Sequence, residues 1–170
     1  MSDDRETTGI LAHAQTLLRG GNIGNALVVE SGRIGTSIAV RAPDGRVHSW
    51  FVPVTVGNQL TSFFQFLPDL TLMRYSSFQR RDDSLEGCPF AESWTDPETI
   101  RRHAEKSARP GETAGVPFLT YDRAPSRLVW AVALKSPDGT TRTVFIAGQV
   151  VWEAPAADIG IDSYGGSQPR

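Results

Sequence analysis

The sequence is poor in several features that identify whole classes of protein. It contains a single cysteine, Cys88, so no disulfide can form within the chain. Its 17 basic and 19 acidic residues leave a net charge of -2, whereas a dedicated nucleic-acid-binding protein normally carries a basic excess. No apolar run approaches the roughly 20 residues that a membrane-spanning helix needs. We therefore expect no nucleic-acid partner and no membrane partner.

The first residues, "MSDDRETTGILAHAQTLLRGG", also lack the pattern of a secretory leader. They begin with acidic residues, they have no basic region, and no unbroken apolar run follows. A chain with one cysteine suits a reducing compartment. The sequence therefore predicts a cytoplasmic protein.

Residues with catalytic or metal-binding chemistry are few and scattered. His13, His48 and His103 are not paired with each other or with cysteine at ligand spacing, so we expect no metal site. The glycine-rich "RGGNIGN" lacks the lysine and hydroxyl residue of a phosphate-binding loop, so no cofactor is expected. Cys88, in "GCPF", has no local activating signature and is predicted to be an inert, partly buried thiol. We predict no catalytic residue, and keep a small enzyme that uses Cys88 or a histidine as the less favoured alternative.

Apolar periodicity and turn residues predict helices and strands in alternation. Helices are expected where apolar residues recur at helical spacing, and strands where β-branched and aromatic residues gather between turn signals. The predicted helices cover residues 4–19, 58–67 and 95–108, and the predicted strands cover 25–31, 35–41, 46–56, 70–79, 115–122, 126–135 and 140–154.

The order of these elements predicts an α+β fold made of two related halves, each a helix packed on an antiparallel sheet. The turn sequence Pro-Asp-Gly occurs in both halves, at Asp44-Gly45 and at Asp138-Gly139, with similar strand residues on either side. A tandem duplication would explain this repeat, although such turns are also frequent in unrelated hairpins. The predicted divisions are the first half at 1–79, a polar linker at 80–95, the second half at 96–153 and a flexible tail at 154–170.

The basic residues are densest at Arg80 and Arg81 and again at Arg101, Arg102 and Lys106. A phosphate-binding role is one reading of this pattern. Acidic residues are interleaved in both stretches, however, which favours a solvated surface of mixed charge.

Aromatic residues supply the candidate binding site. Trp50, Trp130 and Trp152 all lie on predicted strands, whose successive side chains point to opposite faces of a sheet. Alternation cannot place every aromatic side chain of these segments on one face. We therefore predict that the three tryptophans anchor a protein partner on a sheet surface. The alternative is that both faces of the sheet are covered within the monomer.

The C-terminal stretch "SRLVWAVALKSPDGTTRTVFIAGQVVWEA" resembles the PepSY-type module. The matching features are the turn at Asp138-Gly139 and the glycine that precedes a last short strand, at Gly148-Gln149-Val150. The resemblance covers residues 96–152 and implies a helix followed by a three-stranded antiparallel sheet in a cystatin-like layout. It also implies a non-catalytic binding or inhibitory module. The turn before the last strand is shorter here than in the family, and residues 1–79 match less well.

These observations together predict a non-enzymatic protein-binding module: an inhibitor, an immunity or chaperone-like factor, or an accessory subunit. Its expected partner is another protein. A self-associating structural subunit is the main alternative, so a homo-oligomer is possible.

Overall fold

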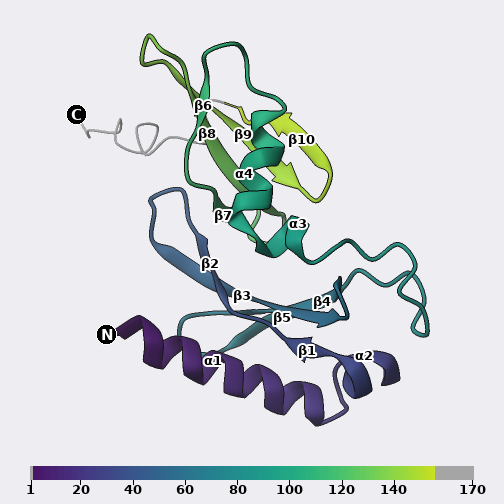
Figure 1. Cartoon of the computed structure of the whole chain (residues 1–170). Coiled ribbons are helices and arrows are strands. Elements are labelled where there is room, and N and C mark those ends of the chain that lie inside the picture. The colour runs from purple at the N-terminus through teal and green to yellow at the C-terminus, as the bar shows by residue number, and fades with distance from the viewer. Residues whose placement is uncertain (1, 156–170) are drawn as a thin grey trace. The chain divides into compact units, whose positions relative to one another are not determined.

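A computed structural model describes residues 2–155 of the chain, which form a mixed α+β fold (Figure 1). The α+β class predicted from the sequence is confirmed. The chain divides into two compact units. The first contains residues 2–39 and 48–95, and the second contains 40–47 and the described residues from 96 onward. Of the predicted tail 154–170, all but the first two residues lie outside the described part. No helix in the described part is long and apolar enough to cross a membrane.

The first unit holds three helices and an antiparallel sheet in which β1, β3, β4 and β5 pair in that order. Its elements are α1 (Ser2–Arg19), α2 (Ala26–Ser31), β1 (Arg33–Ile34), β3 (Val47–Val56), β4 (Gln59–Phe66), β5 (Leu72–Ser77) and α3 (Glu92–Thr95). Strand β2 (Ile38–Arg41) begins in this unit and ends in the second.

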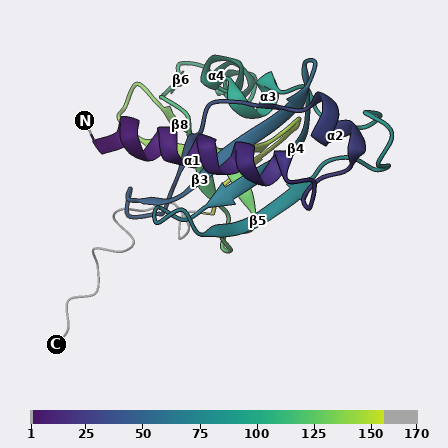
Figure 2. The same ribbon diagram turned by 90° about the horizontal axis from the view of Figure 1, so that it is seen from below.

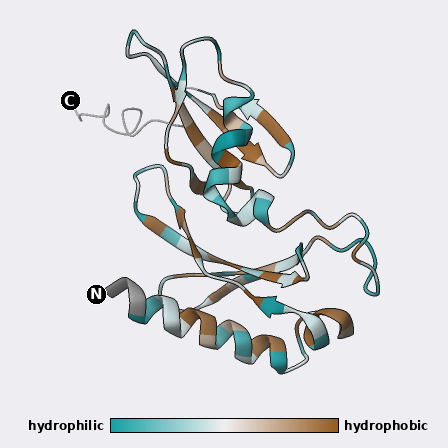
Figure 3. Cartoon of the chain, viewed as in Figure 1, coloured by the Kyte–Doolittle hydropathy of each residue, from teal (hydrophilic) through white to brown (hydrophobic). Residues whose placement is uncertain are grey.

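Helix α1 confirms the helix predicted at residues 4–19. Ile10, Ala14 and Leu18 recur every four residues, so they form one apolar stripe, and all three are buried. Figure 2 shows the helix lying across the strands of the first unit, and Figure 3 shows its alternating hydrophobic and hydrophilic patches. The ring of His13 contacts Phe66 of β4, with 5.4 Å between ring centroids. His13 is thus a half-buried packing residue of the helix.

The helix predicted at residues 58–67 is wrong: this segment forms strand β4, paired on both sides. The apolar spacing that suggests a helix is coincidental, because seven of its eight strand residues are buried and both faces are covered. The signal for a strand was the Gly57-Asn58 pair. Gly57 adopts φ +60° and begins the two-residue loop between Val56 and Gln59, which is a typical hairpin turn.

The strand predicted at residues 25–31 is also wrong, because Ala26–Ser31 forms the short helix α2. The Asn25 side chain accepts a hydrogen bond from the Val28 backbone N–H at 3.1 Å, which caps the helix N-terminus. The same side chain donates to Oε1 of Gln79 at 2.7 Å. The preference of valine for strands depends on its surroundings, so the cap and this tertiary contact decide the local structure.

One face of the first sheet contains a buried polar row. Gln65 of β4 is fully buried. It lies opposite Phe51 of β3 on one side and opposite Arg74 of β5 on the other. Its side-chain nitrogen donates to Ser49 Oγ at 2.8 Å, and its oxygen accepts from Arg74 Nε at 2.9 Å. The Arg74 guanidinium also lies over the ring of Phe63, 4.9 Å from its centroid. Both ends of the buried amide are therefore satisfied.

The second unit is a helix on a sheet in which β10, β9, β8, β7 and β2 are hydrogen-bonded in that order, with β6 on β8. Its elements are α4 (Pro97–Glu105), β6 (Thr113–Ala114), β7 (Phe118–Tyr121), β8 (Leu128–Lys135), β9 (Thr141–Ala147) and β10 (Val150–Glu153). The helix predicted from residue 95 and the three predicted strand segments are confirmed, the last one being divided by Gly148 into β9 and β10.

The two Pro-Asp-Gly turns adopt the same conformation. Gly45 and Gly139 adopt φ +85° and +89°, in the left-handed region that favours glycine. Their backbone hydrogen bonds are also equivalent. The N–H of Ala42 donates to the carbonyl oxygen of Arg46 around the first turn, and the N–H of Ser136 donates to that of Thr140 around the second. Similar local sequences have thus produced the same turn twice.

Candidate functional site

The three tryptophans predicted to contact a partner are mainly covered by the protein itself. Trp50 of β3 is 7% exposed and its indole N–H donates to Glu6 of α1 at 3.4 Å. Trp130 of β8 is 2% exposed. Trp152 of β10 is partly buried. Of the three, only Trp152 has appreciable accessible surface in this conformation, and its role with a partner stays a prediction.

Trp152 belongs to an apolar row that crosses the sheet of the second unit. Strand register places Phe118 opposite Ala131, Ala131 opposite Phe145, and Phe145 opposite Trp152. Directly opposed residues share one face of a sheet, so one residue from each of four adjacent strands contributes to the row. The Phe145 and Trp152 rings meet edge to face, with centroids 6.0 Å apart. We call Phe118, Ala131, Phe145 and Trp152 the aromatic row.

The aromatic row is buried in the middle and accessible toward its ends. Ala131 and Phe145 pack with Val129 and Ala154 in a buried cluster. Phe118, at the β7 end, is 39% exposed. Toward the other end, Val150 lies two residues from Trp152 on β10 and is 62% exposed.

Val116, two residues before Phe118 in the chain, is also exposed, at 86%. The sequence did not single out Phe118 or Val116 as binding residues, because the predicted anchors were the tryptophans on strands. The segment "GVPFLT" contained a signal for this surface. Its proline precedes the short strand β7, in which Phe118 is exposed and the next residue, Leu119, is buried.

The opposite face of this sheet is covered by α4, which packs on β8 and β9. Ile100 and Ala104 of the helix are buried. Arg142 of β9 lies on this face, and its guanidinium donates to the backbone oxygen of Ser107, just beyond the helix. The face that carries the aromatic row is therefore not the one that α4 covers.

Arg142 forms a two-pronged ion pair with Glu112. Its Nε and terminal nitrogen each lie 2.8 Å from a carboxylate oxygen. This hydrogen-bonded pair, helped by the Arg109 backbone N–H, lowers the pKa of Glu112 from 4.5 to about 2. The Arg142 pKa is raised by the same contact. The pair ties the segment after α4 to β9.

We expect Glu112→Gln to destabilise the protein at neutral pH and to lose that effect in acid. Because the folded-state pKa is depressed, the stabilisation is fully present above the unfolded pKa near 4.5 and disappears as pH falls toward about 2. Urea midpoints of both proteins across this range measure the difference. Arg142→Gln removes the partner and should reduce the same pH dependence. A difference between wild type and E112Q that stays constant down to pH ~2 would contradict the assignment.

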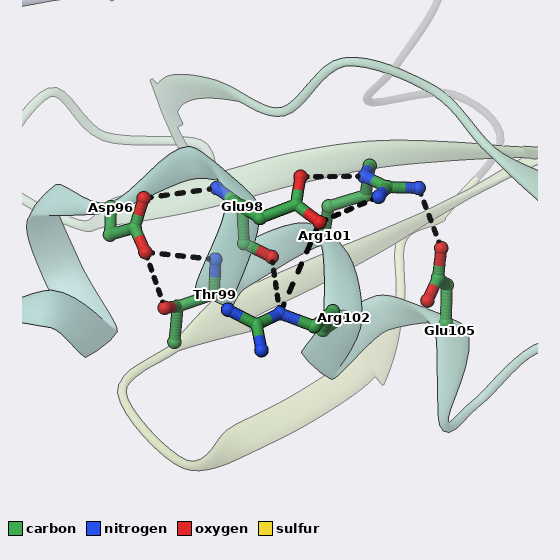
Figure 4. Close-up of polar contacts among 6 residues, drawn as sticks. All are labelled: Asp96, Glu98, Thr99, Arg101, Arg102 and Glu105. Atoms are coloured by element: carbon green, nitrogen blue, oxygen red, sulfur yellow. Dashed lines mark hydrogen bonds and ion pairs between the residues drawn. The ribbon is translucent and has the colours of Figure 1, made fainter.

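The basic residues of α4 form a surface of mixed charge (Figure 4). Arg101 lies between Glu98 and Glu105, at 2.7 Å from a carboxylate oxygen of each. Arg102 lies 4.0 Å from Glu98. Asp96 caps the helix by accepting from the Glu98 and Thr99 backbone N–H groups, and hydrogen bonding to Thr99 lowers its pKa. The Arg101 charge is thus already neutralised within the helix.

The remaining candidates for chemistry are not assembled into a site. Cys88 is buried, and that burial raises the pKa of its thiol, which disfavours the nucleophilic thiolate. His48 shares a hydrogen bond with its neighbour Ser49 at 3.0 Å, and Ser49 is fully buried. Within residues 2–155, no three histidine, cysteine or acidic side chains come together as metal ligands.

Comparison with known proteins adds no assignment to this geometry. No protein-family model, no curated protein and no solved structure matches the chain.

Proposed function

We propose that the protein is a non-enzymatic binding module that engages another protein through the sheet of its second unit. The observation that carries the proposal is Phe118, an aromatic strand residue that is 39% exposed and in register with the rest of the aromatic row. Aromatic side chains at the centre of an interface contribute large contact area at a small entropic cost. Val116 and Val150 add exposed apolar surface in the same unit. Of the three predicted tryptophan anchors, Trp152 is the one that fits this surface.

An inhibitor, an immunity or chaperone-like factor, or an accessory subunit would each use such a surface, as the PepSY-type resemblance also implies. We place this role in the cytoplasm. We also propose that the two halves arose by duplication, which the two equivalent Pro-Asp-Gly turns support. A self-associating subunit would use the same surface with a second copy as its partner.

The test is site-specific photo-crosslinking in the native cell. A benzophenone amino acid in place of Phe118 should give one dominant adduct with a different protein. The matched control carries the same group in place of Arg46, on an exposed turn of the same unit. The same adducts from both positions, or none from position 118, would contradict the proposal. An adduct between two copies of the chain would show that the protein self-associates and would overturn the proposal that its partner is a different protein.

A further inference from the structure

A second candidate site lies in the first unit, on the polar segment after β5. Arg80, Arg81, Ser84 and Glu86 line a cavity of about 140 Å³. A cavity of about 150 Å³ is enough to hold a benzene molecule, so this volume accommodates a phosphate group. All four side chains come from seven consecutive residues, so the site depends on how this one loop is held.

The two arginines of this cavity are exposed to solvent, and the one acidic residue that lines the cavity with them is Glu86. Neither guanidinium forms an ion pair or a hydrogen bond with any residue in the described part of the chain. Arg101 and Arg142, by contrast, are each paired with carboxylates. Two unpaired guanidinium groups lining one cavity favour an anionic ligand, because a planar guanidinium donates two parallel hydrogen bonds to phosphate oxygens.

Glycine at position 87 leaves room for the Arg80 side chain beside the loop backbone. Gly87 adopts φ +83°, and a Cβ at this position would lie 2.8 Å from Arg80 Nε. The guanidinium group therefore rests directly against the Gly87 backbone, and any larger residue would displace it. This contact places Arg80 at the cavity without using its charge.

Two glutamine side chains hold the backbone of the loop. The Gln79 amide nitrogen donates to the Ser84 backbone oxygen at 3.2 Å, and its amide oxygen accepts from Asn25. Gln59 of β4 donates to the backbone oxygens of Leu85 and Cys88, at 3.0 and 3.3 Å. Since the backbone is ordered by these bonds before any ligand arrives, binding costs less conformational entropy.

We infer that this loop binds a phosphate group, with Arg80 and Arg81 contacting its anionic oxygens and the Ser84 hydroxyl donating a further hydrogen bond. Glu86 selects the protonation state of that group. Its carboxylate accepts a hydrogen bond only from a ligand oxygen that carries a proton, so the monoanionic phosphate fits better than the dianion. Phosphate esters exchange this proton near pH 6. Asp82 and Asp83 follow Arg81 in the same loop, so three carboxylates stand against two guanidinium groups, and affinity should rise as pH falls through this region.

Titration of the full-length protein with inorganic phosphate and with O-phosphoserine, followed by amide NMR at constant ionic strength, tests the inference. We expect saturable shifts confined to residues 79–88. Arg81→Ala should bind at least about tenfold more weakly, because it removes one of the two guanidinium groups and leaves the contact between Arg80 and Gly87 in place. Arg46→Ala, which removes an exposed arginine of the second unit, should bind as the wild type does. Shifts that chloride reproduces, an equal loss in Arg46→Ala, or no saturation would overturn the inference.

The two probes and a second variant separate the remaining outcomes. Tighter binding of O-phosphoserine identifies a phosphorylated ligand, whereas equal binding identifies free phosphate, and both support the site. Glu86→Gln should remove the increase in affinity between neutral pH and about pH 6. An unchanged pH profile in E86Q would overturn the role of Glu86 in selecting the ligand.

Discussion

Phe64→Ala is expected to lower the free energy of unfolding by about 3–5 kcal/mol. Phe64 lies on the central strand β4 and is fully buried. Its ring stacks on Phe66 at 5.7 Å and meets Tyr75 at 5.0 Å between centroids. Truncation leaves a cavity between the ring of Phe66 on the same strand and that of Tyr75 on β5, and such a rigid environment relaxes poorly. Urea denaturation measures the change.

Phe90→Ala is the matched control for this variant. Phe90 is 58% exposed in the same unit, so the same truncation there should cost little. Equal losses of stability in the two variants would contradict the placement of Phe64 in the core.

Gln65→Ala should also be strongly destabilising, by about 2–4 kcal/mol, although it replaces a polar residue. The substitution removes the acceptor for Arg74 Nε and a donor to Ser49, and it leaves a cavity beside them. Ser49 is fully buried and would lose that hydrogen bond. Thermal and urea unfolding report the loss.

Gln149→Ala, at the exposed turn between β9 and β10, is the corresponding control and should be close to neutral. Phe64 and Gln65 are adjacent, so large costs at both mean that neighbouring side chains point into two covered faces. An amphipathic helix would place Gln65 toward solvent, and a neutral Gln65→Ala would therefore favour the helix that the sequence predicted here.

Much of the secondary structure follows from local sequence, and the failures have physical causes. Helix α1 was predictable because its apolar stripe repeats at Ile10, Ala14 and Leu18. The strand at residues 58–67 was not predictable in this way, because it is buried on both faces. Apolar and polar residues do not alternate in such a strand, and the apolar residues here happened to fall at helical spacing. The strand prediction at residues 25–31 failed because the Asn25 side chain caps helix α2 and hydrogen-bonds to Gln79.

The candidate binding surface was only partly predictable. Trp152 was selected because it is an aromatic strand residue, but Trp50 and Trp130 satisfy the same criterion and are covered. Which face of a sheet a helix covers depends on long-range packing, and here α4 covers the face opposite the aromatic row. Phe118 became a candidate only through its register with Ala131, which no local pattern specifies.

The affinity of the crosslinked partner for Phe118→Ala protein tests the central claim most directly. We expect a loss of about 2 kcal/mol, equivalent to roughly thirtyfold weaker binding, with the urea midpoint nearly unchanged because Phe118 is partly exposed. Isothermal titration with purified partner gives both dissociation constants. An affinity equal to that of the wild type would show that the aromatic row is part of the fold and not of the interface.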